Sequence, residues 1–394
     1  MTPAARVQAA IDLLDAIIHA ARSKGAPADR VLSEWFRANR YAGSKDRRAI
    51  RNMVYEACRA CGPIPENGRA AMLRLAELHG GIADLFDGSQ YGPQPVKDGD
   101  CAAQGGVAPD WLVRALCEAE VAEDVQHALL ERAPLDIRVN ALKANRADIE
   151  LPLTGEFLPS AQGLRFEAGT SVESWHAYKE GLVEVQDLGS QLIVEALPLQ
   201  PGMVVVDLCA GAGGKTLALA ARLQNQGELV AADTDKRRLG NLAPRAARAG
   251  ALIADTILLD PGRELAALAP YEGRCDHVLV DAPCSGNGTW RRNPEARWRY
   301  DPSGLAQLNA LQDHVLDVAA ALVRPGGTIG FVTCSLLDAE GPQRVHAFLQ
   351  RHPGWQTAPI SLAAPTIARG GGQRLDPLNT RSDGFYVALL EAPC

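Results

Sequence analysis

The sequence predicts an α/β protein whose largest part is a doubly wound, mostly parallel sheet. Three observations support this fold class. Short apolar runs alternate with longer helical stretches after Gln186. Before about residue 130 the periodicity is only helical. Between these two parts lie short apolar runs separated by turn residues. The expected domains are therefore a helical domain over residues 1–130, a small α/β module over 131–185 and a sheet domain over 186–394.

Length and composition limit what the chain can be. With 394 residues, of which 47% are hydrophobic and 22% charged, it is too long for one ordinary core. Its net charge of −7 argues against a surface coated in positive charge. Any contact with nucleic acid would therefore depend on local basic patches.

The N-terminus and the cysteines bear on the compartment. Asp12 and Asp15 interrupt the apolar stretch that begins at Ile11, which argues against a secretory signal or a transit peptide. No stretch is apolar for long enough to span a bilayer, so no membrane is expected as a partner. Nine cysteines are an odd number, which favours reduced thiols over a disulfide framework. We expect a cytoplasmic monomer with free, reactive cysteines.

The elements follow from hydrophobic periodicity. In the N-terminal domain, apolar residues recur at helical spacing over residues 7–21, 28–36, 45–60, 69–78 and 109–119. In the sheet domain, predicted strands cover residues 203–207, 228–233, 254–259, 277–281 and 328–333, and predicted helices cover 217–223, 236–248 and 305–323. Because parallel sheets of this kind bind ligands at the carboxyl ends of their strands, the functional residues are expected there.

A glycine-rich loop follows the first strand of this sheet and runs from Asp207 to Thr216. A phosphate-binding P-loop needs glycine where Cys209 stands, and a dinucleotide fingerprint needs glycine where Thr216 stands. A tight glycine turn remains, with Asp233 at the end of the second strand to accept both ribose hydroxyls. This pattern fits a nucleoside without pyrophosphate, and S-adenosylmethionine is the commonest cofactor of that kind.

A less specific interpretation of this loop stays open. The glycine turn could serve only to pack a helix on a strand, and a lone aspartate at a strand end is often a helix cap or turn former. Asp260 ends the third strand and Asp281 ends the fourth, however, so several carboxylates lie on the same rim of the predicted sheet. Their number favours a ligand site.

Two cysteines follow two strands of the sheet. Cys284 lies in Asp281-Ala-Pro-Cys-Ser-Gly, and Cys334 lies in Val332-Thr-Cys-Ser. A lone cysteine is more often a small buried apolar residue, but both of these lie in loops beside polar residues. A thiolate that adds to C6 of cytosine makes C5 nucleophilic enough to accept a methyl group. Asp281 is placed to hydrogen-bond the base, and Lys215 could lower a thiol pKa.

These motifs together resemble the NOL1/NOP2/Sun family of RNA cytosine-C5 methyltransferases. The resemblance rests on Asp207–Thr216, the Cys284 loop followed by Arg291-Arg-Asn-Pro, the Thr333-Cys-Ser loop and Asp383-Gly-Phe-Tyr, and it covers residues 133 to 394. It implies a Rossmann-like S-adenosylmethionine-dependent methyltransferase domain. The helical N-terminus resembles the NusB-like extension of the bacterial small-subunit ribosomal RNA methyltransferase B branch, which implies RNA-binding roles for the helical domain and the small module.

The resemblance also implies residue roles. Cys334 would be the nucleophile and Cys284 the thiol that assists product release, while Lys215 could reach either the base or the cofactor carboxylate. The cofactor site would comprise Cys209, Ala210, Gly211, Ala212, Gly213, Gly214, Lys215, Asp233, Arg238, Asp260 and Asp281. Two positions depart from the family pattern. Ala212 stands where proline is usual, and Glu340-Gly341-Pro342 replaces an acidic run, which leaves the support of the Cys334 loop open.

Contacts to RNA are expected just after Cys284, where Trp290, Arg291, Arg292 and Arg297 combine aromatic faces with guanidinium groups. The alternative is a solvated charged loop. A second basic stretch, residues 45–51, is equally well explained as a solvated helix face. Cys58 and Cys61 have metal-ligand spacing but lack a second ligand pair, so helix packing is expected and no metal.

Two other functions remain open. DNA cytosine-C5 methyltransferases also use a Pro-Cys loop, where that cysteine is the nucleophile, but the additional Thr-Cys-Ser loop favours RNA. A non-catalytic RNA-binding ribosome assembly factor could keep the fold, although it would not need both cysteines. We expect ribosomal RNA of the small subunit as the substrate. The target cytosine must be unpaired or flipped out of its stack.

Overall fold

The computed structural model describes residues 1–394 and divides into two units. Unit 1 contains residues 1–131 and 285–305, and unit 2 contains residues 132–284 and 306–394. In neither unit is any helix both long enough and apolar enough to cross a lipid bilayer.

Unit 1 is helical, as the periodicity of its apolar residues predicts. Its main helices are α1 (Pro3–Arg22), α2 (Ala28–Ala38), α3 (Ser44–Ala60), α4 (Gly68–Leu78), α5 (Asp110–Glu118) and α6 (Glu123–Ala128), with short 3-10 helices η1 (Gly80–Leu85), η3 (Asn287–Thr289) and η4 (Pro294–Trp298). The Thr2 hydroxyl caps α1 by accepting a hydrogen bond from the amide of Ala5 (3.2 Å). Leu14 and Ile17 of α1 pack with Ile50 of α3 in a buried core.

The segment 285–305 belongs to unit 1 although it is far from the other helices in sequence. Trp298 is buried in the core of this unit, and its indole Nε1 donates to the carbonyl of Gly62 (3.1 Å). The carboxylate of Glu295 accepts from the amide of Ala28 at the start of α2 (3.1 Å). These contacts complete the helical unit with residues that follow Cys284.

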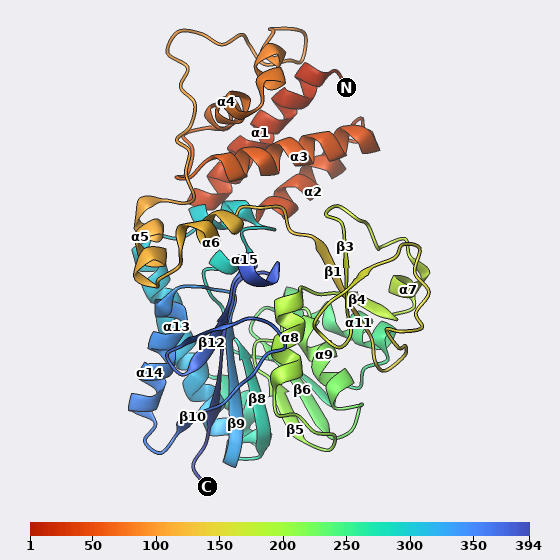
Figure 1. Ribbon diagram of the computed structural model, residues 1–394, viewed down its shortest axis with the longest axis vertical. Coiled ribbons are helices and arrows are strands. Elements are labelled where there is room, and N and C mark those ends of the chain that lie inside the picture. The colour runs from red at the N-terminus through yellow and green to blue at the C-terminus, as the bar shows by residue number, and fades with distance from the viewer. The chain divides into compact units, whose positions relative to one another are not determined.

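Unit 2 is built on a nine-stranded sheet, drawn in green to blue in Figure 1. Its strands are β5 (Val204–Asp207), β6 (Glu228–Asp233), β7 (Asp255–Leu258), β8 (Cys275–Asp281), β9 (Val323–Thr333), β10 (Gln356–Ala358), β11 (Ile367–Arg369), β12 (Gly372–Leu375) and β13 (Phe385–Glu391). The order is β11-β12-β13-β9-β8-β5-β6-β7, with β10 beside β13. Strands β5 to β9 pair in parallel, as predicted, while β10 to β13 add antiparallel pairs.

Helices cover both faces of this sheet, so alternate residues of a strand lie in different cores. Val205 belongs to the core with α8 (Leu188–Ala196), α9 (Gly214–Arg222), α10 (Lys236–Leu239) and α11 (Leu242–Ala249). Val206 belongs to the core with α12 (Glu264–Leu268), α13 (Pro302–Leu322) and α14 (Pro342–Arg351). The short helices η2 (Ala269–Tyr271), η5 (Asp338–Glu340) and α15 (Pro377–Thr380) complete the unit. The helix predicted over residues 236–248 is divided into α10 and α11.

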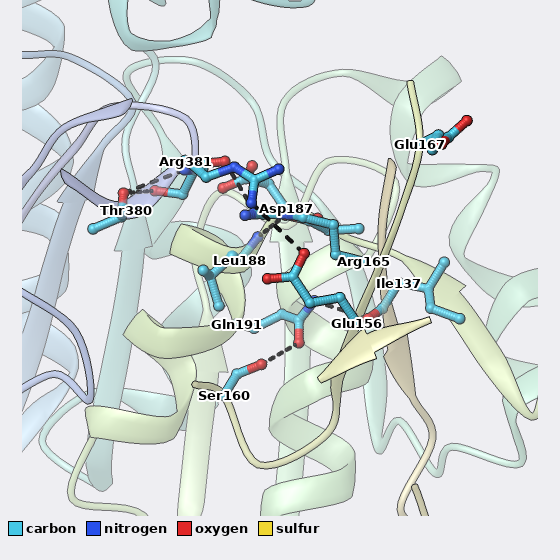
Figure 2. A network of polar contacts seen from close by, with 12 residues as sticks. Ile137, Glu156, Ser160, Arg165, Glu167, Asp187, Leu188, Gln191, Thr380 and Arg381 are labelled. Atoms are coloured by element: carbon cyan, nitrogen blue, oxygen red, sulfur yellow. Dashed lines mark hydrogen bonds and ion pairs between the residues drawn. The ribbon is translucent and has the colours of Figure 1, made fainter. Parts of the chain in front are cut away.

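A second, four-stranded antiparallel sheet in unit 2 has the order β2-β3-β1-β4. It consists of β1 (Leu135–Val139), β2 (Glu156–Phe157), β3 (Gly163–Phe166) and β4 (Val183–Val185), with α7 (His176–Lys179). Figure 2 shows how polar contacts join it to the rest of the unit. The guanidinium of Arg165 donates to both oxygens of Asp136 (2.7 and 2.8 Å) and to the carbonyl of Arg381 (2.9 Å). The other Asp136 contact, from the amide of Leu188 (3.1 Å), ties β1 to the start of α8.

Candidate active site

The strand order of the large sheet reverses between β5 and β8. Strand β5 pairs in parallel with β6 on one side and with β8 on the other. In sheets of this type, ligands bind at such a switch point, beyond the carboxyl ends of the strands. Asp207, Asp233 and Asp281 are the last residues of β5, β6 and β8. The predicted rim of carboxylates is therefore present.

The glycine loop between β5 and α9 is held against Asp233. Gly211 and Gly213 have φ angles of 57° and 86°, which only glycine adopts without strain. The Asp233 carboxylate is 7% exposed and accepts from the amides of Gly211 (2.7 Å) and Asp235 (2.7 Å). A Cβ atom added at Gly213 would lie 2.2 Å from Leu242 Cδ1, whereas one added at Gly214 would meet open space. The loop thus leaves room above the first residue of α9.

These residues fit S-adenosylmethionine. Each oxygen of Asp233 keeps a lone pair for a ribose hydroxyl, and the space over Gly214 allows a ligand to approach the backbone. Arg238 lies over the loop. A Cβ atom added at Gly211 would lie 2.4 Å from a nitrogen of its guanidinium. Asp260 is exposed in the turn after β7.

Burial raises the pKa values of two groups beneath this loop. Burial raises the pKa of Asp207 to about 7, against the effect of the Thr216 hydroxyl, which donates to Oδ2 (2.6 Å). Its Oδ1 is buried without a hydrogen-bond partner. Burial also raises the pKa of the Cys209 thiol, and the charges of Asp207, Asp281 and Asp233 act in the same direction. The Cys209 thiol is therefore neutral and unsuited to nucleophilic attack.

Lys215 and Asp281 form an ion pair at the centre of the site. Lys215 Nζ donates to Asp281 Oδ2 at 2.7 Å, and it lies 5.5 Å from the ring centroid of Phe385. Burial alone would lower the pKa of Lys215, but the Asp281 carboxylate and the nearby Cys334 sulfur raise it above its usual value. Lys215 is thus a fixed positive charge beside Cys334.

The two cysteines predicted from the strand ends converge. Cys334 is one residue beyond β9 and Cys284 is three beyond β8, and these strands are parallel neighbours with Asp281 opposite Val332. The two Sγ atoms lie 3.2 Å apart. Both side chains are half-buried. The pairing of β8 with β9 therefore brings together two thiols that are 50 residues apart in sequence.

The support of the Cys334 loop, left open by the sequence, comes from arginines. Arg369 donates through two nitrogens to the Asp338 carboxylate (3.0 and 2.7 Å). Arg344 donates to the carbonyl of Ala339 (2.9 Å). These contacts hold the segment that follows Cys334 where the family pattern has additional acidic residues.

The residues predicted to clamp RNA lie inside unit 1 rather than on its surface. Trp290, Arg291 and Arg297 are 0%, 4% and 1% exposed. One guanidinium nitrogen of Arg297 donates to the carbonyls of both Cys58 and Cys61, which are themselves buried. The physical reason is that the carbonyls near the end of α3 lack hydrogen-bond donors within their helix. The guanidinium of Arg297 donates to them instead. RNA contact remains a proposal only for Arg292, which is half-buried.

The second predicted basic stretch does form a surface feature. A hollow of about 540 Å³ in unit 1 is lined by Ser33, Phe36, Arg37, Arg40, Arg47 and Arg51. The guanidinium carbons of Arg47 and Arg51 each lie 5.7 Å from the ring centroid of Phe36. We call these six residues the arginine hollow. It contains no carboxylate, so it is a local basic patch on an acidic chain.

Two residues beside the glycine loop were not predicted as part of the site. Phe385, in the quoted Asp383-Gly-Phe-Tyr motif, packs under Lys215. Gln186 Nε2 donates to the carbonyl of Gly214 (3.3 Å) and its Oε1 accepts from Arg138 (2.7 Å). The pKa of Arg138 is lowered to about 10 by burial. The sequence feature that could have identified Gln186 is its position directly after an apolar run. A polar residue at the end of such a run can reach a neighbouring loop.

The chain is similar to known ribosomal RNA methyltransferases. A family model described as 16S rRNA methyltransferase RsmB/F matches residues 194–391. The probable ribosomal RNA small subunit methyltransferase B of Synechocystis is 33% identical over 300 residues, which are 72% of this chain and 66% of that protein. The ribosomal RNA small subunit methyltransferase B of Xanthomonas campestris is 31% identical over 353 residues, 87% of this chain and 76% of that protein.

The chain thus spans 66% of the length of the Synechocystis relative and of a Bacillus subtilis relative. Among solved structures, NSun6 from Pyrococcus horikoshii with SFG superposes with a TM-score of 0.63 at 20% identity, covering 72% of this chain and 98% of that chain. This likeness concerns the fold. Because the family model matches half of the chain and the Xanthomonas relative is covered over three quarters of its length, the chain belongs to the RsmB/F family of 16S rRNA methyltransferases, and S-adenosylmethionine is its cofactor.

Proposed function

We propose that the chain methylates C5 of a cytosine in small-subunit ribosomal RNA, with Cys334 as the nucleophile and Cys284 as the thiol that assists release. The observation that carries this proposal is the 3.2 Å separation of the two sulfurs beside the Lys215–Asp281 ion pair. A single reactive cysteine would explain a covalent adduct, but two converging thiols suit a reaction that forms an adduct and then resolves it.

In this reaction the Cys334 thiolate adds to C6 of the base, and Lys215 stabilises the thiolate before attack. N3 takes up a proton from solvent as the C6–S bond forms, and Asp281 accepts hydrogen bonds from N3–H and the amino group, so that C5 becomes an enamine carbon. Asp233 and the glycine loop would hold S-adenosylmethionine, which when bound would supply the methyl group for C5. Deprotonated Cys284 Sγ then accepts the C5 proton, the C5–C6 double bond re-forms as the C6–S bond breaks with its electron pair returning to Cys334, and N3 returns its proton to solvent.

The RNA partner is supported by the arginine hollow of unit 1. An electrostatic contact with phosphates would supply affinity without sequence information, as is usual for backbone contacts. An RNA substrate of the small ribosomal subunit also agrees with the names of the Synechocystis and Xanthomonas relatives. A cytoplasmic location would keep both thiols reduced.

The two cysteines can be tested separately. RNA containing 5-fluorocytosine traps the adduct, because the fluorine cannot leave as the proton does. We expect Cys334→Ala to abolish the trapped complex, and Cys284→Ala to retain it and to accumulate a covalent complex with ordinary RNA as well. Loss of the complex in Cys284→Ala alone would reverse the roles and favour the DNA-methyltransferase pattern.

The substrate and the catalytic competence need their own measurement. Bisulfite sequencing of ribosomal RNA from cells with and without the gene should show one cytosine that loses its methyl group. Methyl transfer from labelled S-adenosylmethionine to subunit precursors, naked RNA and duplex DNA should favour RNA. A purified chain that binds RNA but transfers no methyl group to any of these would instead be an assembly factor.

A further inference from the structure

Two buried side chains join the loops that carry the cysteines. Gln312 in α13 is 0% exposed, and its Nε2 donates to the carbonyl of Pro283 (2.9 Å) and to Glu340 Oε1 (3.2 Å). Pro283 directly precedes Cys284. The side chain of Gln312 therefore hydrogen-bonds both the backbone of the Cys284 loop and the side chain of Glu340.

Glu340 continues the connection to the other cysteine. Its backbone carbonyl accepts from the hydroxyl of Thr333 (3.0 Å), and Thr333 directly precedes Cys334. Glu340 and Thr333 are each 0% exposed. The path Pro283–Gln312–Glu340–Thr333 thus runs from one cysteine loop to the other without crossing solvent. We call it the loop brace.

The orientation of the Gln312 amide shows what the side chain is placed for. Two oxygens face Nε2, which settles the assignment of its nitrogen and oxygen atoms. The Gln312 Oε1 atom is buried without a hydrogen-bond partner. A buried unsatisfied oxygen is unfavourable, and an apolar side chain in α13 would avoid it. The residue is therefore suited to donating to both loops rather than to packing alone.

We propose that Gln312 and Glu340 are positioning residues that keep the sulfurs of Cys284 and Cys334 within reach of one base. This inference rests on the proposed two-cysteine reaction and adds residues to it. Neither side chain is assigned contact with the reacting atoms. Attack on C6 needs only Cys334, whereas release needs both sulfurs at the same base, so losing the brace should slow release more than attack.

The spacing of the sulfurs can be measured without any methylation. In a background where the exposed Cys101, Cys117 and Cys394 are changed to serine, diamide should link Cys284 to Cys334. Each thiol gives up a proton and an electron, the S–S bond forms, and diamide is reduced to its hydrazine. Peptide mass spectrometry follows the linked pair. We expect Gln312→Met to slow this reaction roughly tenfold, as the loss of a supporting hydrogen bond allows.

The matched control is Gln307→Met, an exposed glutamine in the same helix, which should cross-link at the parent rate. Glu340→Gln keeps an oxygen acceptor for Gln312 and should stay close to the parent, whereas Glu340→Ala should resemble Gln312→Met. If Gln312→Met does not fold, Glu340→Ala carries the same test. Equal rates in the parent and the brace variants would overturn the proposal, as would a parent protein that forms no Cys284–Cys334 link.

The second measurement uses RNA. Gln312→Met should accumulate a covalent RNA complex on denaturing gels, as Cys284→Ala does, and the double variant should be no worse than Cys284→Ala alone. A folded Gln312→Met enzyme with equally slowed adduct formation and release would show that the brace has only a general structural role. The cross-linking result is independent of methyl transfer, so failure of the proposed reaction and failure of the brace are distinguishable.

Discussion

Lys215 is the one cationic side chain placed directly on Asp281, and it lies near Cys334 as well. Sequence reasoning left open whether this lysine reaches the base or the cofactor carboxylate. The 2.7 Å contact with Asp281 gives it a different first partner, the carboxylate that we propose hydrogen-bonds the base. Its charge therefore orients Asp281 beside Cys334.

Replacing Lys215 by methionine keeps the length of the side chain and removes its charge. We expect single-turnover methylation to fall by about one to two orders of magnitude. The reason is that the ammonium group that holds the Asp281 carboxylate would be absent. The control is Lys179→Met in α7, an exposed lysine. An unchanged single-turnover rate in Lys215→Met would contradict the role of its charge.

Asp207 makes stability depend on pH. Its pKa is raised from the usual value near 4 to about 7 by burial, so the folded state favours the neutral carboxyl. The stability that this group contributes is present below pH 4 and is lost as the pH rises to about 7. Asp207→Asn should remove this loss. Between pH 4 and pH 8 the free energy of unfolding should therefore fall by about 2 to 4 kcal/mol less in the variant than in the parent.

Urea unfolding of both proteins at a series of pH values checks this expectation. The Thr216 hydroxyl can donate to the asparagine oxygen as it does to Asp207, so the hydrogen bond is preserved. Parallel stability curves for the two proteins between pH 4 and pH 8 would show that Asp207 is ionised normally.

At the scale of elements, the junction of β5 with α9 separates two roles of neighbouring glycines. Gly213 has φ 86° and its missing Cβ leaves room for Leu242. Gly214 has no such neighbour and borders open space. Gly213 is thus required by the packing of the fold, whereas Gly214 leaves the loop accessible to a ligand.

The matched substitutions Gly213→Ala and Gly214→Ala should therefore behave differently. Gly213→Ala should lower the free energy of unfolding by about 1 to 3 kcal/mol, because of backbone strain and the contact with Leu242. Gly214→Ala should leave thermal stability unchanged and weaken binding of S-adenosylmethionine, measured by calorimetry. Equal affinity of Gly214→Ala and the parent would place the ligand elsewhere.

At the scale of the whole molecule, the chain enters unit 1 again after Cys284 and returns to unit 2 at residue 306. The segment between these points looks like an exposed RNA-binding loop in the sequence, since it combines tryptophans with arginines. In the structure Arg297 satisfies carbonyls of the helical unit. Its guanidinium therefore contributes to folding rather than to an exposed clamp.

Arg297→Ala should lower the free energy of unfolding by about 2 to 4 kcal/mol, because it leaves buried carbonyls without donors. RNA affinity of the folded variant should stay at the parent value at a temperature well below its Tm. Urea unfolding and filter binding measure the two quantities. A large loss of RNA affinity with normal stability would restore the contact that the sequence suggested.

The arginine hollow should show the opposite pattern. Arg40→Ala and Arg51→Ala remove exposed side chains and should leave stability unchanged while weakening RNA binding. Each should reduce the slope of log affinity against log salt by about 0.7 to 0.9. Arg30→Ala, whose partner is Glu34, is the control for loss of an arginine outside the hollow. A slope equal to that of the parent would exclude the hollow from the RNA surface.

The sequence by itself determined the helical domain, the parallel strands β5 to β9, the glycine loop and the position of Cys284 and Cys334 at strand ends. These features depend on periodicity and on local turn chemistry, both of which are determined by residues that are close in sequence. The antiparallel strands β10 to β13 were not predicted. Only β13 pairs with β9, with Tyr386 opposite Thr333, and β10 and β12 pair in turn with β13, so their local sequence gives little sign of a strand.

Only the tertiary structure decided the separation of the two sulfurs, the pairing of Lys215 with Asp281, the burial of Arg297 and the contacts of Gln312. Each depends on residues that are distant in sequence and that meet because β8 lies beside β9 or because residues 285–305 pack in unit 1. Composition and spacing specify which groups a chain carries. Which of them face one another is a property of packing, because desolvation and hydrogen-bond partners arise only when distant segments meet.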